Sequence, residues 1–192
     1  MKTRFGLVFA LIFTLILSAC GKKEIENAVN WPIKDFSATT EQNKSMGLKD
    51  LKGKVWISAF IFTSCADVCP PMTSNMVKLQ KKLKEENLKD VELVSFSVDP
   101  TVDTPEILTR YAKQFGADLD NWTFLTGYSQ EFIEKFAMES FKTIVKKPVE
   151  GNQVIHQTYL YLVDKKGNIK KTYSGYKNVP YEEIINDIKT LE

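Results

Sequence analysis

One stretch constrains the fold of this chain more than any other: residues 55–62 (VWISAFIF) are apolar at almost every position. A β-branched and aromatic run of this length predicts a strand that is buried on both faces, which is typical of the centre of a helix-covered sheet. Pro70 and Pro71 follow shortly afterwards and suit the first turn of a helix, where a missing N–H costs nothing. The apolar residues behind them share one helical face: Met72, Met76, Leu79 and Leu83.

The alternation of strand and helix patterns continues to the end of the chain. Further strands are predicted at 91–98, 121–125, 157–164 and 169–176, and helices after the capping residues Thr104 and Ser129 and at 180–191. This order predicts an α/β fold with a central mixed sheet flanked by helices, closed by a C-terminal β-hairpin and helix. Because two cysteines lie at the first strand-to-helix junction, the arrangement is the thioredoxin-like plan.

The N-terminus reads MKTRFGLVFALIFTLILSAC. Lys2 and Arg4 precede an apolar run that is too short to span a bilayer and has the length of a signal-peptide core. The small residues before Cys20 resemble a bacterial lipobox, in which the cysteine receives lipid. We therefore expect a signal peptide at 1–19, a lipid-anchored tether at 20–30 and one domain at 31–192. An ordinary secretory signal or an uncleaved anchor is the alternative interpretation.

Charge and compartment exclude some functions. Loss of residues 1–19 would remove Lys2 and Arg4 but no acidic residue, so the formal charge of +2 falls to zero. A neutral domain is not expected to bind nucleic acid. Export places the domain where disulfides are permitted.

With Cys20 assigned to lipid, Cys65, Cys69 and the single histidine His156 are the candidates for chemistry. A redox disulfide, a metal site and a plain structural disulfide all remain open for the two cysteines. If the segment between them were helical, their Cβ atoms would lie about 5–6 Å apart, which is wide for a disulfide and comfortable for two thiolates on one metal ion. Zinc prefers a closed set of four ligands, so copper is the better prediction.

Three features together resemble the Sco/SenC family: Cys65-x-x-x-Cys69-Pro70 after an apolar strand, the segment 95–105 (SFSVDPTVDTP), and His156 directly before the strand at 157–164. These are membrane-tethered, thioredoxin-like copper proteins that assist assembly of the binuclear copper (CuA) centre of cytochrome c oxidase. Many relatives are tethered by a transmembrane helix, whereas this chain is expected to carry a lipid.

The resemblance implies that Cys65, Cys69 and His156 bind copper, as Cu(I) or Cu(II). When no metal is bound, we also expect the two thiols to cycle through a disulfide. The resemblance implies a metallochaperone rather than an enzyme, with no catalytic residue. The implied partner is cytochrome c oxidase subunit II. The protein would be a monomer at the outer face of the bacterial cytoplasmic membrane. Asp99 would lie close to the metal behind the ligands, although a turn-forming role at the strand end is an equal alternative.

Two other functions compete with copper delivery. A thiol–disulfide oxidoreductase could act on the cysteines of oxidase subunit II, but proteins of that kind usually carry Cys-x-x-Cys. A peroxiredoxin-like peroxidase ranks last, because that family places threonine three residues before its reactive cysteine and this chain has Phe62 there.

Overall fold

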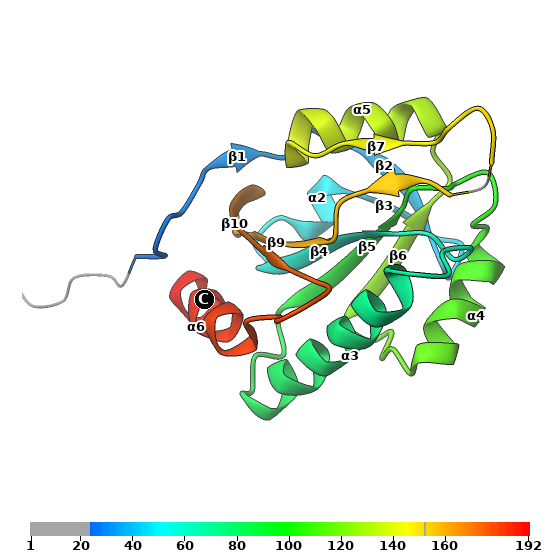
Figure 1. The fold of residues 1–192 in the computed structure, drawn as a ribbon. Helices are drawn as coiled ribbons and strands as arrows, with labels where there is room; N and C mark the ends of the chain where they lie inside the picture. Colours follow the sequence, from blue (N-terminus) through cyan, green and yellow to red (C-terminus); the bar gives the residue numbers. More distant parts are fainter. Residues whose placement is uncertain (1–23, 152) are drawn as a thin grey trace, which may run out of the picture.

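The computed structural model describes residues 24–151 and 153–192, which form a sheet covered by helices on both faces (Figure 1). The predicted signal peptide at 1–19 and the predicted lipidation site Cys20 lie outside the described residues. No helix in the described ranges is both long enough and apolar enough to cross a membrane.

Eight strands of the described chain join into one sheet in the order β1-β10-β9-β4-β5-β6-β2-β3. The three central strands β4, β5 and β6 run parallel, and the hairpin of β9 and β10 joins β4 antiparallel. The predicted mixed sheet and C-terminal hairpin are therefore confirmed. The strand bounds are β1 Trp31–Pro32, β2 Ser37–Thr40, β3 Ser45–Gly47, β4 Trp56–Ile61, β5 Glu92–Ser97, β6 Trp122–Thr126, β9 Tyr159–Val163 and β10 Asn168–Ser174, and the separate pair is β7 Val145–Lys146 with β8 Ile155–His156.

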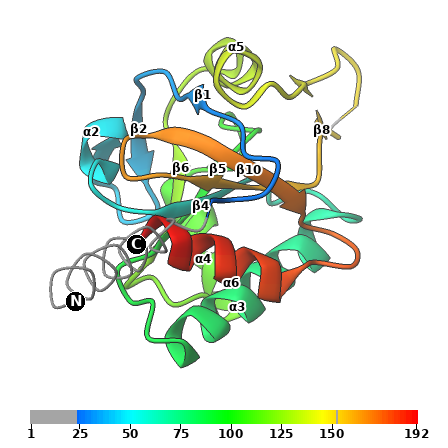
Figure 2. The same cartoon turned by 90° about the vertical axis from the view of Figure 1, so that its left-hand side faces the viewer.

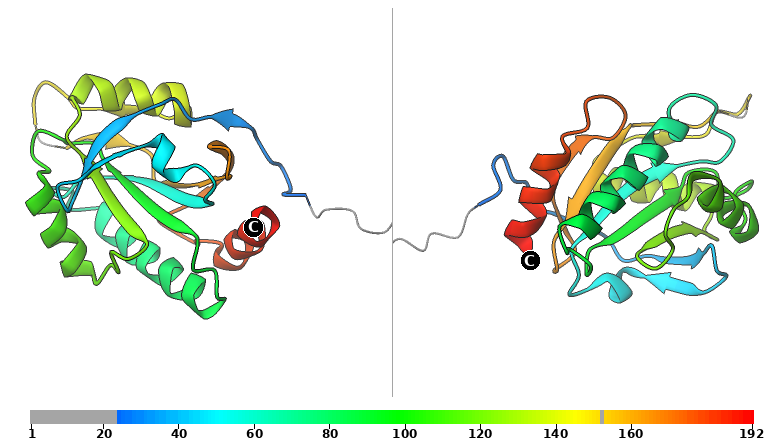
Figure 3. Two further views of the ribbon diagram at one scale, coloured as in Figure 1. Left: turned by 180° about the vertical axis from the view of Figure 1, so that it is seen from behind. Right: turned by 90° about the horizontal axis from the view of Figure 1, so that it is seen from below.

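The central strand β4 is buried at every position, as the apolar run predicts. Its side chains alternate between two cores, because successive residues of a strand point to opposite faces. Ile57 and Ile61 belong to the core shared with helices α3, α4 and α6, which lie side by side across one face of the sheet (Figure 3). Trp56 and Phe60 belong to an aromatic core on the opposite face, which α5 covers.

The long helices of the described chain are α3 Cys69–Glu85, α4 Pro105–Phe115, α5 Gln130–Phe141 and α6 Tyr181–Leu191. The caps predicted for α4 and α5 are present: the hydroxyl oxygens of Thr104 and Ser129 each accept the N–H three residues further on. Gly116 ends α4 in the left-handed conformation, with a φ of 70°.

Short elements are where the structure departs from the sequence-based prediction. The helix α2 Leu48–Leu51 has no predicted counterpart, and neither do β7 and β8. Strands of two residues show no periodicity from which they could be recognised. Figure 2 shows β1 beside β10 at the edge of the sheet. The packed chain also starts before Trp31, because Ile25 is buried in the core beside α6. The segment expected as tether therefore contacts the domain at Ile25.

Candidate metal and thiol site

The two cysteines lie where β4 leads into α3. Cys69 is the first residue of α3, and Cys65 lies in the preceding loop. Residues 65–68 are not helical, so the helical spacing considered from the sequence does not apply. Both thiols are free and buried. The backbone N–H of Cys69 donates to Cys65 Sγ at 3.4 Å, so the start of the helix stabilises negative charge on that sulfur.

His156 reaches the same place from β8. Its Nε2 lies 3.4 Å from Cys69 Sγ, which brings together residues separated by 87 positions. Its Nδ1 lies 2.9 Å from the backbone carbonyl oxygen of Gln157, and a carbonyl can only accept, so Nδ1 carries the hydrogen. Nε2 is therefore the ring nitrogen that faces the sulfur. The Phe62 ring packs edge-on against the imidazole, with 5.7 Å between ring centroids.

The two thiols have opposite electrostatic environments. Burial raises the pKa of Cys65, but hydrogen bonds with His156 and with the backbone of Cys69 and Asp67 outweigh burial and lower that pKa to about 6. Burial raises the pKa of Cys69 well above its usual range, and the charge of Cys65 raises it further. At neutral pH the structure therefore holds one thiolate, at Cys65, and one thiol, at Cys69. Such an asymmetry is typical of reactive cysteine pairs.

The donor set fits a soft metal ion by its chemistry. Thiolates and imidazole are the ligands that copper prefers in proteins. The Nδ1 hydrogen bond of His156 to a carbonyl is the usual support of a metal-binding histidine, because it orients the ring and leaves Nε2 free. Within residues 24–151 and 153–192, no group of three or more Cys, His, Asp or Glu side chains is positioned to hold a metal ion. The donors would therefore have to move together on binding.

Asp99, which the resemblance places near the metal, directs its carboxylate to other partners. It pairs with Lys147 Nζ at 2.6 Å and accepts from the Thr101 hydroxyl at 2.8 Å. Its own N–H donates to the hydroxyl oxygen of Ser97, as expected of a residue at a strand end. Asp99 is therefore a buried residue whose side chain is paired with Lys147. Lys147 was not among the candidate residues predicted from the sequence.

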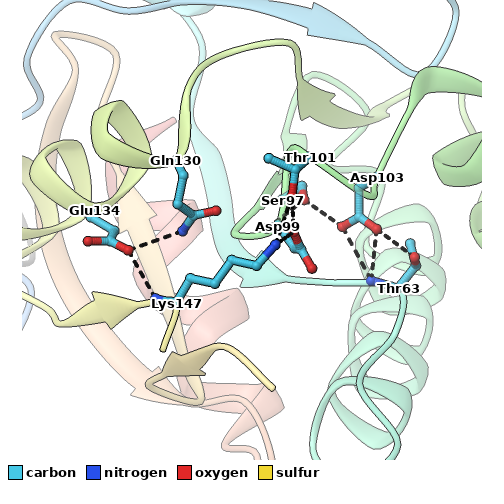
Figure 4. Close-up of polar contacts among 8 residues, drawn as sticks. All are labelled: Thr63, Ser97, Asp99, Thr101, Asp103, Gln130, Glu134 and Lys147. Atoms are coloured by element: carbon cyan, nitrogen blue, oxygen red, sulfur yellow. Dashed lines mark hydrogen bonds and ion pairs between the residues drawn. The ribbon is translucent and has the colours of Figure 1, made fainter. Parts of the chain in front are cut away.

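The carboxylate that contacts the cysteine loop is Asp103, which sequence reasoning missed as a site residue. It accepts from the N–H and the hydroxyl of Thr63, two residues before Cys65, and from the hydroxyl of Ser97 (Figure 4). Asp103 lies in the same DPTVDTP segment as Asp99, and that segment was the available signal. Its contacts fix the start of the loop that carries the first thiol.

The fold and the site together define a class: a thioredoxin-like protein with two thiols at the first strand-to-helix junction and one imidazole facing them. A family model described as SCO1/SenC matches residues 27–191, and the chain belongs to this family. The SCO1 protein homolog of Bacillus subtilis (strain 168) is 50% identical over 190 residues, which cover 99% of this chain and 97% of that protein.

Solved structures of the same family are similar in fold. A SCO1/SenC family lipoprotein from Bacillus anthracis str. Ames has a TM-score of 0.84 at 52% identity, covering 87% of this chain and 98% of that one. BsSco, described as a cytochrome c oxidase assembly protein with a disulfide switch, has a TM-score of 0.82 at 48% identity, covering 88% and 98%. Arabidopsis thaliana ScoI with copper bound has a TM-score of 0.69 at 31% identity, covering 82% and 96%.

Proposed function

We propose that this protein is a copper metallochaperone that assists assembly of the CuA centre of cytochrome c oxidase, with Cys65, Cys69 and His156 as the copper ligands. One contact supports this function most directly: His156 Nε2 lies 3.4 Å from Cys69 Sγ, and the N–H of Cys69 contacts Cys65 Sγ. The copper bound to the Arabidopsis relative supports copper as the metal. The name of BsSco as a cytochrome c oxidase assembly protein supports a role in oxidase assembly.

The chemistry of the site suits a cargo that must be held and released. Two thiolates alone can hold Cu(I), and the imidazole of His156 adds the harder ligand that Cu(II) requires. Cys65 is already a thiolate at neutral pH, whereas the raised pKa of Cys69 means that its proton must leave when the metal binds. Copper loading is therefore expected to release protons and to weaken as the pH falls.

The proposed partner is oxidase subunit II, whose copper-binding cysteines would receive the metal. Lipid on Cys20 would hold the protein at the outer face of the bacterial cytoplasmic membrane, since a lipoprotein's two or more acyl chains anchor firmly. The lipoprotein relative from Bacillus anthracis supports this anchor.

Copper titration tests the function. The full-length protein, purified in detergent and reduced, is titrated with Cu(I) and with Cu(II), beside Cys65→Ala, Cys69→Ala and His156→Ala. We expect both cysteine variants to lose tight binding of either ion, and His156→Ala to lose mainly Cu(II). The function is wrong if the wild type binds copper no more tightly than the variant that lacks both cysteines.

The thiol asymmetry favours a second function, reduction of the disulfide of an oxidase subunit II apoprotein. The Cys65 thiolate would attack one target sulfur and form a mixed disulfide. The Cys69 thiol, after loss of its proton, would displace that sulfur, so the target leaves with two thiols and the domain keeps a Cys65–Cys69 disulfide. Incubation of the reduced protein with an oxidised subunit II peptide, followed by thiol counting on both partners, measures this exchange.

A further inference from the structure

His156 lies on a hairpin that has little structure of its own. The strands β7 and β8 pair only Val145 with His156 and Lys146 with Ile155. An isolated hairpin is at best marginally stable in water, even when its strands are longer. The place of the imidazole relative to the thiols therefore depends on what fastens this hairpin to the rest of the domain.

Apolar packing holds the hairpin on the domain. Val145 in β7 and Val154, directly before β8, are buried against the aromatic core. Val149 in the connecting loop and Ile155 in β8 are exposed to solvent. Because apolar burial has no preferred direction, it can hold the hairpin on the domain without fixing its orientation over the cysteines.

Lys147, the residue directly after β7, supplies directional contacts. Its Nζ lies 2.6 Å from Asp99 Oδ1 and 2.7 Å from Thr101 Oγ1. Its backbone N–H donates to Glu134 Oε1 on α5 at 2.9 Å. Figure 4 shows this side chain extended across the gap between the α5 side and the loop at 99–103. Lys147 therefore joins the hairpin to two other parts of the domain.

The ion pair of Lys147 is unlike those on the surface. The Asp99 side chain is 2% exposed and that of Lys147 is 25% exposed. The neighbouring Lys146 also pairs with an acidic residue, Glu134, but its side chain is 64% exposed. Surface pairs contribute little because water screens them, whereas loss of one partner of a buried pair leaves an uncompensated charge.

The loop at 99–103 holds both halves of the site. On the thiol side, Asp103 accepts from the N–H and the hydroxyl of Thr63, at the start of the cysteine loop. On the imidazole side, Asp99 binds Lys147 from the hairpin of His156. The loop at 99–103 thus contacts both the cysteine loop and the hairpin of the imidazole, although these come from distant parts of the chain.

We propose, resting on the copper-binding function above, that Lys147 is a positioning residue: its ion pair with Asp99 sets the orientation of the β7–β8 hairpin and so the approach of His156 to the thiols. Without this ion pair the hairpin keeps its apolar contacts at Val145 and Val154 but pivots, and the imidazole spends less time facing Cys69. Binding that needs the imidazole weakens, and binding that needs only the thiols persists.

The test compares Lys147→Met with the matched control Lys146→Met in the full-length protein in detergent. Amide hydrogen exchange of the metal-free protein follows the β7–β8 amides, and titrations give the affinities for Cu(I) and Cu(II). We expect Lys147→Met to lose protection at Val145 and His156 and to bind Cu(II) about 10- to 100-fold more weakly, as when a supporting partner of a metal ligand is removed. Its Cu(I) affinity and all properties of Lys146→Met should match the wild type.

A second variant keeps the test decisive if Lys147→Met does not fold. Lys147→Met combined with Asp99→Asn removes both charges, so no buried carboxylate is left unpaired, and it should show the same loss of β7–β8 protection. Unchanged exchange in whichever of these variants folds, or equal weakening of Cu(I) and Cu(II) in Lys147→Met, would overturn the positioning role. A wild type that binds no copper would instead refute the proposed function, and the exchange measurement would still decide on the hairpin.

Discussion

Replacement of Asp103 by alanine removes an acceptor that is 0% exposed and serves three donors. The carboxylate accepts from the Ser97 hydroxyl, the Thr63 hydroxyl and the Thr63 N–H. Alanine offers no acceptor, and the site has little access to water. The donors would therefore be left without their present partner, at the point where the cysteine loop begins.

The loss of stability in Asp103→Ala follows from two opposing effects, the lost hydrogen bonds and the cost of burying the carboxylate. Hydrogen bonds to a charged group contribute about 1.5 kcal/mol or more each, so three contribute roughly 5 kcal/mol. Burial opposes this, since it raises the pKa of Asp103 and so disfavours the ionised form. We expect the free energy of unfolding to fall by about 2–4 kcal/mol. For a domain of this size the melting temperature then falls by about 5–15 °C.

Thermal and urea unfolding, followed by circular dichroism, measure the loss. Asp120→Ala is the matched control, because Asp120 is exposed and the same substitution there should change the free energy of unfolding by less than about 0.5 kcal/mol. If Asp103→Ala melts within about 2 °C of Asp120→Ala, the hydrogen bonds to Thr63 and Ser97 do not hold the cysteine loop, and the reasoning is refuted.

Three further outcomes can be checked on the same protein. Alkylation by iodoacetamide, mapped by mass spectrometry, should modify Cys65 first, because the thiolate is the reactive form. The rate should rise with pH, with a midpoint at about 6, and then level off, since the pKa of Cys65 is lowered to about 6. A midpoint in the ordinary cysteine range would contradict the site geometry. In His156→Ala that midpoint should move to higher pH, since a hydrogen bond that lowers the pKa is gone, and an unmoved midpoint would exclude the contact. Ser129→Ala should lower the free energy of unfolding, measured in urea, by about 1 kcal/mol through loss of the α5 cap, whereas an unchanged value would mean that water replaces the cap.

Much of the fold could be predicted because its signals are local. The buried run at 55–62 required helices on both faces, and the capping residues Thr104 and Ser129 marked helix starts that the structure has. Each signal depends on neighbours within a turn or a strand, where periodicity and hydrogen-bonding side chains act directly. The two-residue strands and α2 gave no such signal, because their conformation follows from pairing and packing with distant segments.

The candidate site divides in the same way. The residue types of the site, two cysteines and a histidine, were readable from their scarcity and their position in the strand and helix pattern. The contact between Cys69 and His156 could not be predicted, because it joins residues 87 positions apart and depends on the path of a hairpin. The role of Asp99 was also undecided and Asp103 was missed, since both lie in one short segment and either could have faced the cysteines.

By itself the sequence determined the order of the elements, the junction that carries the thiols and the identity of the candidate donors, because each of these is encoded in contiguous residues. Only the tertiary structure decided that Asp103 holds the cysteine loop, that Lys147 ties the hairpin of His156 to Asp99, and that one thiol is ionised at neutral pH while the other is not. These properties arise from burial and from contacts between distant segments, which exist only once the chain has packed.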